Sequence, residues 1–254
     1  MLCLEKMEAL LKRHHEDIAA VIIEPLVQGA AGMLVSPPGY AKGVKRLCRK
    51  YNVLMIADEV ATGFGRTGRM FACEHEHIRP DILCLAKGLT GGYLPLAATL
   101  TTEKIYRQFL GRYKDFKTFF HGHTYTGNQL ACATAIASLH VFRKEKTLRK
   151  LQKKIDTLKK ALAPVSEFPH VGDMRQQGFM VGIELVKNKE TRDPYPVERR
   201  MAWQVCRKAR DNGLIIRPLG DVIVIMPPLS ISTQELKSLV RITAEAIKEV
   251  TESK

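Results

Sequence analysis

The sequence lacks several features that would place it in a specialised class of protein. It has no apolar stretch of about 18 residues and no charged-then-apolar leader, so it predicts neither membrane insertion nor export. Its six cysteines form no C-x-x-C pair, and several lie in apolar runs, which is typical of reduced thiols in a cytosolic protein. It shows no internal repeat and no low-complexity segment. We therefore expect a cytoplasmic globular protein with reduced cysteines and no cysteine-based metal site.

The composition that is present is ordinary, apart from an excess of basic charge. Apolar residues make up 45% of the chain and charged residues 26%, and the net charge is +14. The densest basic run, residues 143–160, keeps Leu148, Leu151, Ile155 and Leu158 at helical spacing. No aromatic residues interleave with its charges, as base stacking on nucleic acid would require. We interpret this run as a helix with a solvated basic face, and a phosphate-bearing small molecule stays open as the anionic partner.

The hydrophobic pattern indicates two parts of different texture. The first part alternates helical spacing with strand-like apolar runs, and its strand-helix-strand order over 19–59 is that of a crossover in a parallel sheet. From about residue 165 the pattern indicates a smaller α+β unit. Helices are predicted over 3–16, 37–52, 128–142, 197–211 and 233–250, and strands or strand pairs over 19–25, 53–59, 81–87, 94–102, 178–186 and 213–229.

Residues 63–68, GFGRTG, have the spacing of a dinucleotide-binding glycine loop. That loop requires a strand that turns directly into a helix at the first glycine, and an acid at the end of the next strand. Here the apolar run 53–57, which reads as a strand buried on both faces, ends well before Gly63, and no helical apolar repeat follows the loop. The next apolar run, 82–86, ends in Lys87. We therefore predict that this loop does not bind a dinucleotide.

Charged residues follow three predicted strands at their carboxyl ends, namely Glu24, Asp58 and Lys87. Ligands of open parallel sheets bind at that edge. A lysine there is either an ion-pair partner or a nucleophile whose amine is activated by partial burial. The glycines of GLTGGYLP after Lys87 allow a planar ligand to approach the backbone, and Asp58 can hold a protonated ring nitrogen. A Schiff-base lysine and an acid on a pyridinium nitrogen are what pyridoxal phosphate requires of a protein.

Five longer segments resemble the class III aminotransferases of fold type I. They are IIEPLVQGAAGM, IADEVATGFGRTGRMFACE, PDILCLAKGLTGGYLPLAATLTT, FFHGHTYTGNQLACA and GLIIRPLGDVIVIMPPL. The resemblance extends over the whole chain and implies an α/β fold. Residues 1–163 would form the back part of the family's large, pyridoxal-phosphate-binding domain, with a mostly parallel sheet and helices. Residues 164–254 would form its small C-terminal α+β domain.

The resemblance implies the cofactor pyridoxal 5'-phosphate and a role for each of three residues beside it. Lys87 would form the Schiff base and carry protons, Asp58 would bind the pyridine nitrogen, and Val60 would pack on the ring. In the segment HGHT, Gly122 would contact substrate.

The resemblance implies further contacts that involve a homodimer and the substrate. His123 and Thr124 would reach the cofactor phosphate of the neighbouring subunit, although many family members have proline where His123 stands. Arg217 would bind the carboxylate of the keto substrate, a role that suits a planar bidentate donor. The GFGRTG loop would lie near the dimer interface, with Arg66 as an ion-pair partner. A metal site at His121 and His123 is the alternative, but no further ligands are suggested nearby.

The implied reaction is transfer of an amino group onto 8-amino-7-oxononanoate in biotin biosynthesis, with S-adenosylmethionine or lysine as the donor. Another class III aminotransferase acting on an ω-amino acid or a diamine is the alternative, and a catalytically silent fragment is a third. The family's front half, which cradles the cofactor phosphate, has no counterpart in the sequence. We therefore expect the chain alone to be inactive, with partners for the strands at 19–25 and 53–59 supplied by that half.

Overall fold

The computed structural model describes residues 2–252, which form two compact units. Unit 1 contains the N-terminal residues up to Leu26, Ser36–Phe64 and Phe71–Glu145. Unit 2 contains Val27–Val35, Gly65–Met70 and the chain from Lys146 onwards. Two short segments of the first half of the sequence therefore belong with the C-terminal half. The domains predicted at 1–163 and 164–254 stay a prediction.

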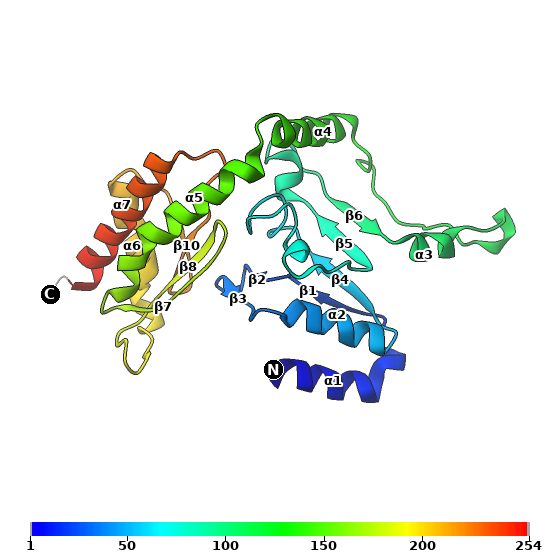
Figure 1. Cartoon of the computed structure of the whole chain (residues 1–254), viewed down its shortest axis with the longest axis horizontal. Coiled ribbons are helices and arrows are strands. Elements are labelled where there is room, and N and C mark those ends of the chain that lie inside the picture. The colour runs from blue at the N-terminus through cyan, green and yellow to red at the C-terminus, as the bar shows by residue number, and fades with distance from the viewer. Residues whose placement is uncertain (1, 253–254) are drawn as a thin grey trace. The chain divides into compact units, whose positions relative to one another are not determined.

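Unit 1 is built on a four-stranded sheet in the order β1-β4-β5-β6 (Figure 1). Strands β1 (Ala20–Ile23), β4 (Leu54–Asp58) and β5 (Ile82–Leu85) are parallel, whereas β6 (Ala98–Thr101) is antiparallel to β5. This confirms a mostly parallel sheet and the predicted crossover from β1 through a helix to β4. The helices are α1 (Leu2–His14), α2 (Tyr40–Lys50), α3 (Glu103–Tyr106) and α4 (Gln129–Lys144), and the 3-10 helices are η1 (His15–Asp17), η2 (Ala72–Glu76), η3 (Lys87–Thr90), η4 (Arg107–Phe109) and η5 (Tyr113–Asp115).

Strand β4 carries its core side chains on one face only. Met55 and Ala57 are fully buried, whereas Leu54 and Ile56, which point the other way, are half-buried. The expectation that this run is buried on both faces is therefore wrong within the described chain. The predicted pairing also needs correction, because β4 lies between β1 and β5 and lacks no neighbour. It is β1 that forms the edge of the sheet, with Ile22 61% exposed.

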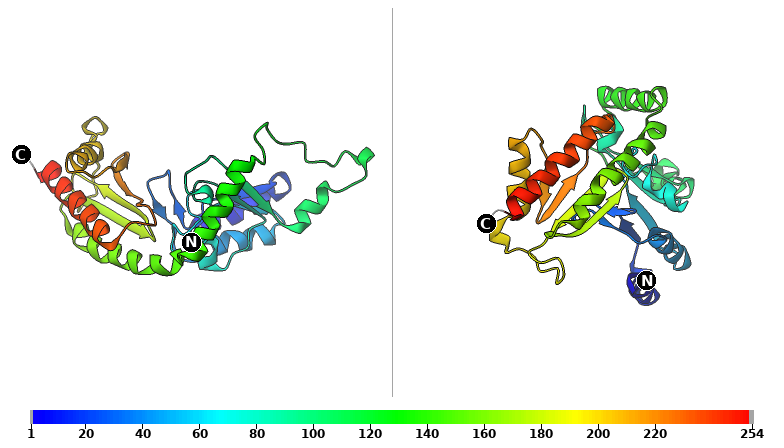
Figure 2. Two further views of the ribbon diagram at one scale, coloured as in Figure 1. Left: turned by 90° about the horizontal axis from the view of Figure 1, so that it is seen from above. Right: turned by 60° about the vertical axis from the view of Figure 1, so that its left-hand side comes forward.

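Residues 103–128, which we call the arm, extend away from the sheet of unit 1 in Figure 1 and in the left-hand view of Figure 2. The arm has few contacts with the rest of the unit, and its side chains are exposed almost throughout. It includes several large apolar side chains that lie in solvent, namely Tyr106, Phe109, Leu110, Tyr113, Phe116, Phe119, Phe120 and Tyr125. After the arm, α4 begins where the Asn128 side chain accepts a hydrogen bond from the backbone N–H of Ala131 (2.9 Å).

Unit 2 is an antiparallel sheet with helices packed against it. The strand order is β7-β8-β10-β9, and Figure 2 shows α5 and α7 side by side. Most of the basic run of the sequence forms α5, whose Leu151, Leu158 and Leu162 are buried, as predicted. Its other lysines are exposed, but Lys154 is half-buried and its ammonium donates to the carbonyl of Leu229 (2.8 Å). The elements are β7 (Val171–Gln177), β8 (Met180–Leu185), β9 (Arg217–Leu219), β10 (Val222–Ile225), α5 (Thr147–Leu162), α6 (Met201–Asp211), α7 (Thr233–Glu252), η6 (Ala163–Glu167), η7 (Val197–Arg199) and the hairpin β2 (Val27–Gln28) and β3 (Leu34–Val35).

The middle of the GFGRTG segment forms a tight turn within unit 2. Gly65 and Gly68 both have positive φ, and the backbone N–H of Gly68 donates to the carbonyl of Gly65 (2.9 Å). The Arg66 guanidinium donates to the carbonyl of Pro227 (2.5 Å), so its partner here is a carbonyl and not the predicted carboxylate. The segment leads into the short 3-10 helix η2 instead of an α-helix. The turn therefore has the glycines of a nucleotide loop without its strand-to-helix geometry.

Candidate active site

Asp58 and the segment before Lys87 lie next to each other at the carboxyl ends of two parallel strands. Asp58 is the last residue of β4, and its partner in the ladder with β5 is Cys84. Lys87 follows three residues after Cys84 and begins η3. Neighbouring strands are about 4.8 Å apart, so an acid and an amine are carried on adjacent strands at the edge where ligands of such sheets bind.

The carboxylate of Asp58 is held by the backbone immediately after it. Its Oδ1 accepts a hydrogen bond from the N–H of Val60 (3.0 Å), which leaves the other oxygen free for a ligand. Asp58 and Val60 are both half-buried. Burial, and then the negative charge of Asp58, raise the pKa of the neighbouring Cys84 thiol, which therefore stays protonated beside the carboxylate. The predicted cofactor residues Asp58 and Val60 thus lie together.

Lys87 is exposed and adopts a backbone conformation that is unusual for lysine. Its φ is +42°, in the left-handed region that non-glycine residues seldom occupy. The next residue, Gly88, lies against Phe64, and a Cβ at Gly88 would come within 2.7 Å of the Phe64 Cβ. Gly92, in contrast, has open space around it. In the segment GLTGGYLP, Gly88 is therefore needed for close packing, whereas Gly92 leaves the backbone accessible.

The HGHT residues lie in an exposed turn at the end of the arm. The N–H of His123 donates to the Thr126 hydroxyl (3.0 Å), and the N–H of Tyr125 donates to Nδ1 of the His123 ring (3.1 Å). Gly122 and Thr124 are exposed as well. These contacts order the turn without covering it, so their predicted roles toward substrate and cofactor phosphate stay predictions.

Arg217 belongs to unit 2. It is the first residue of β9, its side chain is exposed, and it lies opposite Val224 of β10. Within residues 2–252 no carboxylate forms an ion pair with it, so the guanidinium is available for a ligand of that unit. Its predicted role in binding a keto acid is a proposal.

Glu59 is a buried acid that the sequence reasoning did not single out. Its side chain is fully buried, and its carboxylate accepts hydrogen bonds from the N–H groups of Ala72 (2.6 Å) and Cys73 (2.8 Å). Burial raises the pKa of Glu59, and these hydrogen bonds oppose that shift. The signal was in the sequence: Val53, Met55, Ala57 and Glu59 alternate along β4, so the buried face continues to the acid.

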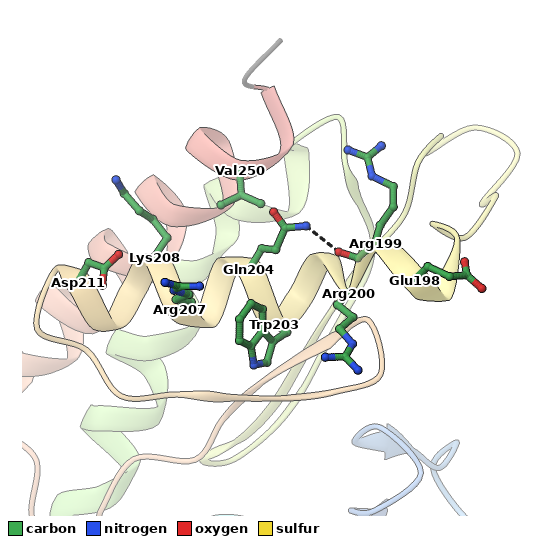
Figure 3. Close-up of a pocket in the computed structure, with 9 residues that line it drawn as sticks. All are labelled: Glu198, Arg199, Arg200, Trp203, Gln204, Arg207, Lys208, Asp211 and Val250. Atoms are coloured by element: carbon green, nitrogen blue, oxygen red, sulfur yellow. Dashed lines mark hydrogen bonds between the residues drawn. The ribbon is translucent and has the colours of Figure 1, made fainter.

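A surface hollow lies elsewhere, along α6 of unit 2 (Figure 3). Trp203 lies between Arg200 and Arg207, and the Arg207 guanidinium is 5.6 Å from the centre of the Trp203 ring. None of the predicted site residues lines it. Over residues 2–252, no group of three His, Cys, Asp or Glu is placed to bind a metal ion, and no helix is both long and apolar enough to cross a membrane.

The fold defines an α/β protein in which an acid and a lysine lie at or just beyond the carboxyl ends of two adjacent parallel strands. The family model described as aminotransferase class-III matches residues 1–247. The chain belongs to the class III aminotransferase family.

Individual relatives agree with this family. An adenosylmethionine-8-amino-7-oxononanoate aminotransferase from Nitratidesulfovibrio vulgaris is 59% identical over 99% of the chain and 46% of its own length. The protein of the same name from Aquifex aeolicus is 56% identical over 97% of the chain and 54% of its own length. The crystal structure of the Methanocaldococcus jannaschii protein of that name matches with a TM-score of 0.96 at 51% identity, over 98% of this chain and 58% of the other. The chain thus spans about half the length of these relatives.

Proposed function

We propose that this chain is part of a pyridoxal-phosphate-dependent aminotransferase that converts 8-amino-7-oxononanoate to 7,8-diaminononanoate in biotin biosynthesis. The observation that carries the proposal is that Asp58 ends β4 and Lys87 follows the adjacent parallel strand β5 in a class III aminotransferase fold. The names of the relatives at 51–59% identity support the choice of substrate. The proposed cytoplasmic location agrees with this biosynthetic role.

The chemistry of the residues present fits pyridoxal phosphate. When bound, this cofactor supplies an aldehyde that accepts amines and a protonated pyridine ring that withdraws electrons. A primary amine and a carboxylate are the two groups that it needs from the protein, and Lys87 and Asp58 provide them on neighbouring strands. The free oxygen of Asp58 would hold the ring N–H, and the half-buried Val60 would contact the ring face.

Lys87 has two tasks in this proposal. Its Nζ would hold the cofactor, and as a free amine it would move a proton to and from substrate carbon. Its exposure within unit 1 allows both the attachment and the release. Asp58 would accept a hydrogen bond from the ring N–H.

The remaining roles concern substrate and the second subunit of a proposed homodimer. Arg217 would bind the carboxylate of the keto substrate through its two parallel N–H donors. Gly122 would contact substrate, while His123 and Thr124 would donate to the cofactor phosphate of the neighbouring subunit. The exposed apolar side chains of the arm, which carries these three residues, support a role in association with another subunit.

The test is an amino-transfer assay with 8-amino-7-oxononanoate, with S-adenosylmethionine and lysine as separate donors. It uses the chain alone and the chain joined to the front half of the Nitratidesulfovibrio vulgaris relative. We expect the joined protein to form 7,8-diaminononanoate, and the chain alone to form none. Asp58→Asn should slow transfer by orders of magnitude, whereas Arg217→Ala should mainly raise the KM for the keto substrate. Transfer only from an ω-amino acid or a diamine to another carbonyl acceptor would overturn the proposed substrate, and no transfer at all would overturn the proposed activity.

A further inference from the structure

Glu59 is a fully buried carboxylate directly after the proposed cofactor residue Asp58. Because successive strand residues point to opposite faces, Asp58 faces the site while Glu59 faces the core. Both oxygens of Glu59 are occupied. Oε1 accepts from the N–H of Cys73 (2.8 Å), and Oε2 accepts from the N–H of Ala72 (2.6 Å) and the Thr62 hydroxyl (3.2 Å). The acid therefore joins the end of β4 to the start of η2.

The backbone of Glu59 also connects the end of β4 to β5, the strand that precedes Lys87. Its N–H donates to the carbonyl of Cys84 in β5 (3.0 Å), three residues before Lys87, and its carbonyl accepts from the N–H of Gly63 (3.0 Å). A Cβ at Gly63 would come within 2.8 Å of that carbonyl oxygen, so the turn after Glu59 is tightly packed. One residue thus fixes both strand ends and the turn that follows.

Phe64 and Phe71 lie between the residues bound by Glu59 and the Lys87 segment. Phe64 is 4% exposed, and its ring meets that of Phe71 edge to face at 5.7 Å. Phe71 directly precedes the two N–H groups held by Glu59, and Phe64 packs so closely on Gly88 that no side chain fits there. Gly88 follows Lys87, whose positive φ needs support from its surroundings.

We propose that Glu59 is a positioning residue, whose buried carboxylate holds the Phe64–Phe71 pair against Gly88 and thereby fixes Lys87 relative to Asp58. This inference rests on the proposed function, because it assigns Glu59 a task in cofactor attachment. An apolar side chain would fill the core without the cost of burying an acid. What it would not provide is an acceptor for the two N–H groups of η2. We therefore infer that Glu59 positions the residues around Lys87, and does not only stabilise the fold.

The first arm of the test does not involve the cofactor. Hydrogen exchange is measured on the chain as wild type, as Glu59→Gln, and as the control Glu235→Gln, which changes an exposed acid that caps α7 through the N–H of Ser232 (2.7 Å). A glutamine presents an N–H₂ group to one of the two backbone donors, so Glu59→Gln should speed exchange about tenfold at Ala72 and Cys73. The proposal requires that the N–H groups of Leu89 and Gly91, next to Lys87, also exchange faster. If the change stays confined to η2, the proposal is overturned.

The second arm uses the chain joined to the front half of the Nitratidesulfovibrio vulgaris relative, and it measures cofactor attachment at Lys87 by borohydride reduction and peptide mass over a range of pyridoxal phosphate concentrations. The proposal predicts that Glu59→Gln needs about tenfold more cofactor for half-maximal labelling of Lys87, and that Glu235→Gln matches wild type. Equal labelling by Glu59→Gln and wild type would overturn it. If wild type itself is not labelled at Lys87, the proposed function fails, while the exchange measurement still decides whether Glu59 supports the Lys87 segment.

A milder pair of variants covers the case in which Glu59→Gln does not fold. Thr62→Val removes only the hydroxyl that donates to Glu59, and Thr62→Ser keeps it. We expect Thr62→Val to speed exchange at Cys73 and Leu89 together, and Thr62→Ser to leave both unchanged. Faster exchange at Cys73 alone in Thr62→Val would count against the proposal.

Discussion

Within residues 2–252, the two units differ in how far their large apolar side chains are buried. In unit 2, all three helices and most of the main sheet contribute to one buried cluster that includes Phe179, Ile183 and Leu236. In unit 1, the buried clusters are small, and apolar side chains of β1, the arm and α4 lie in solvent. Exposed apolar surface of this kind marks regions that other polypeptide segments cover. Unit 2 therefore buries many of its large apolar side chains in one core, while unit 1, which carries Asp58 and Lys87, exposes many of its own.

The strongest test of this comparison removes one aromatic ring from each unit. Phe179 is fully buried in unit 2, and Phe179→Ala should lower the free energy of unfolding by about 3–5 kcal/mol through lost burial and a cavity. Phe116→Ala in the arm, where the ring is 70% exposed, should change it by less than about 0.5 kcal/mol. Chemical denaturation followed by circular dichroism gives both values. Similar losses for the two variants would show that the arm is packed.

Thiol reactivity distinguishes the closed core from the open surface. Burial raises the pKa of the Cys206 thiol of unit 2 to about 11, so at pH 8 roughly one thiol in a thousand is ionised. Cys3 of unit 1 is exposed. Iodoacetamide at pH 8, followed by peptide mass spectrometry, should label Cys3 within minutes and leave Cys206 unlabelled until the protein unfolds. Equal rates in the native protein would contradict a closed core in unit 2.

The sheet of unit 1 depends on a carboxylate at the start of β5. Asp81 accepts hydrogen bonds from the Lys45 ammonium (2.7 Å) and the N–H of Met55 (2.8 Å). Burial alone would raise its pKa, but these two donors hold the pKa of Asp81 below its ordinary value. The resulting stability is present above about pH 4 and is lost as the pH falls through the lowered pKa. Asp81→Asn should therefore cost about 1–2 kcal/mol at pH 7, with partial exposure taken into account, and less at pH 3.

Denaturation curves of wild type and Asp81→Asn at several pH values check this prediction. The gap between the two curves should close toward low pH. A gap that is independent of pH would mean that the Asp81 charge does not contribute to the sheet.

The smallest expected effect concerns the arm itself. Phe120 is 77% exposed, so Phe120→Ser should leave the free energy of unfolding within about 0.5 kcal/mol of wild type. The variant should nevertheless lower the aggregated fraction of the chain, because it removes apolar surface from solvent. Light scattering at fixed concentration measures this, with the exposed Tyr93→Ser of the same unit as the matched control. Unchanged scattering in Phe120→Ser would show that the arm does not drive association.

The sequence predicted the elements whose hydrophobic period is clear. The crossover from β1 to β4, the amphipathic helix α5 and the closing helix α7 were all confirmed, because each has a regular apolar pattern. Strand β7 was missed, since its sequence VGDMRQQ has no apolar run and its side chains are mostly half-buried. The sequence also could not predict that Val27–Val35 belongs to unit 2. It depends on long-range contacts such as the two hydrogen bonds from Arg175 to the carbonyl of Gly32.

For the candidate site, the sequence predicted the positions of Asp58 and Lys87 along the chain, but not the backbone conformation of Lys87. Asp58 and Lys87 were placed at strand ends from the apolar runs before them, and the structure confirms that placement. The positive φ of Lys87 and the contact between Phe64 and Gly88 depend on packing between segments that are distant in sequence. The partner of Arg66, a carbonyl oxygen, could not be read from residue type either.

The most direct test of the account is to map the lysine that pyridoxal phosphate labels. The chain, joined to the front half of the Nitratidesulfovibrio vulgaris relative, is incubated with the cofactor, reduced with borohydride and digested, and the modified peptide is identified by mass. The account predicts one saturable label, on Lys87, which Lys87→Ala abolishes while the exposed control Lys104→Ala keeps it. A saturable label on a different lysine, or a label that persists in Lys87→Ala, would contradict the assignment of the active site to the edge of the unit 1 sheet.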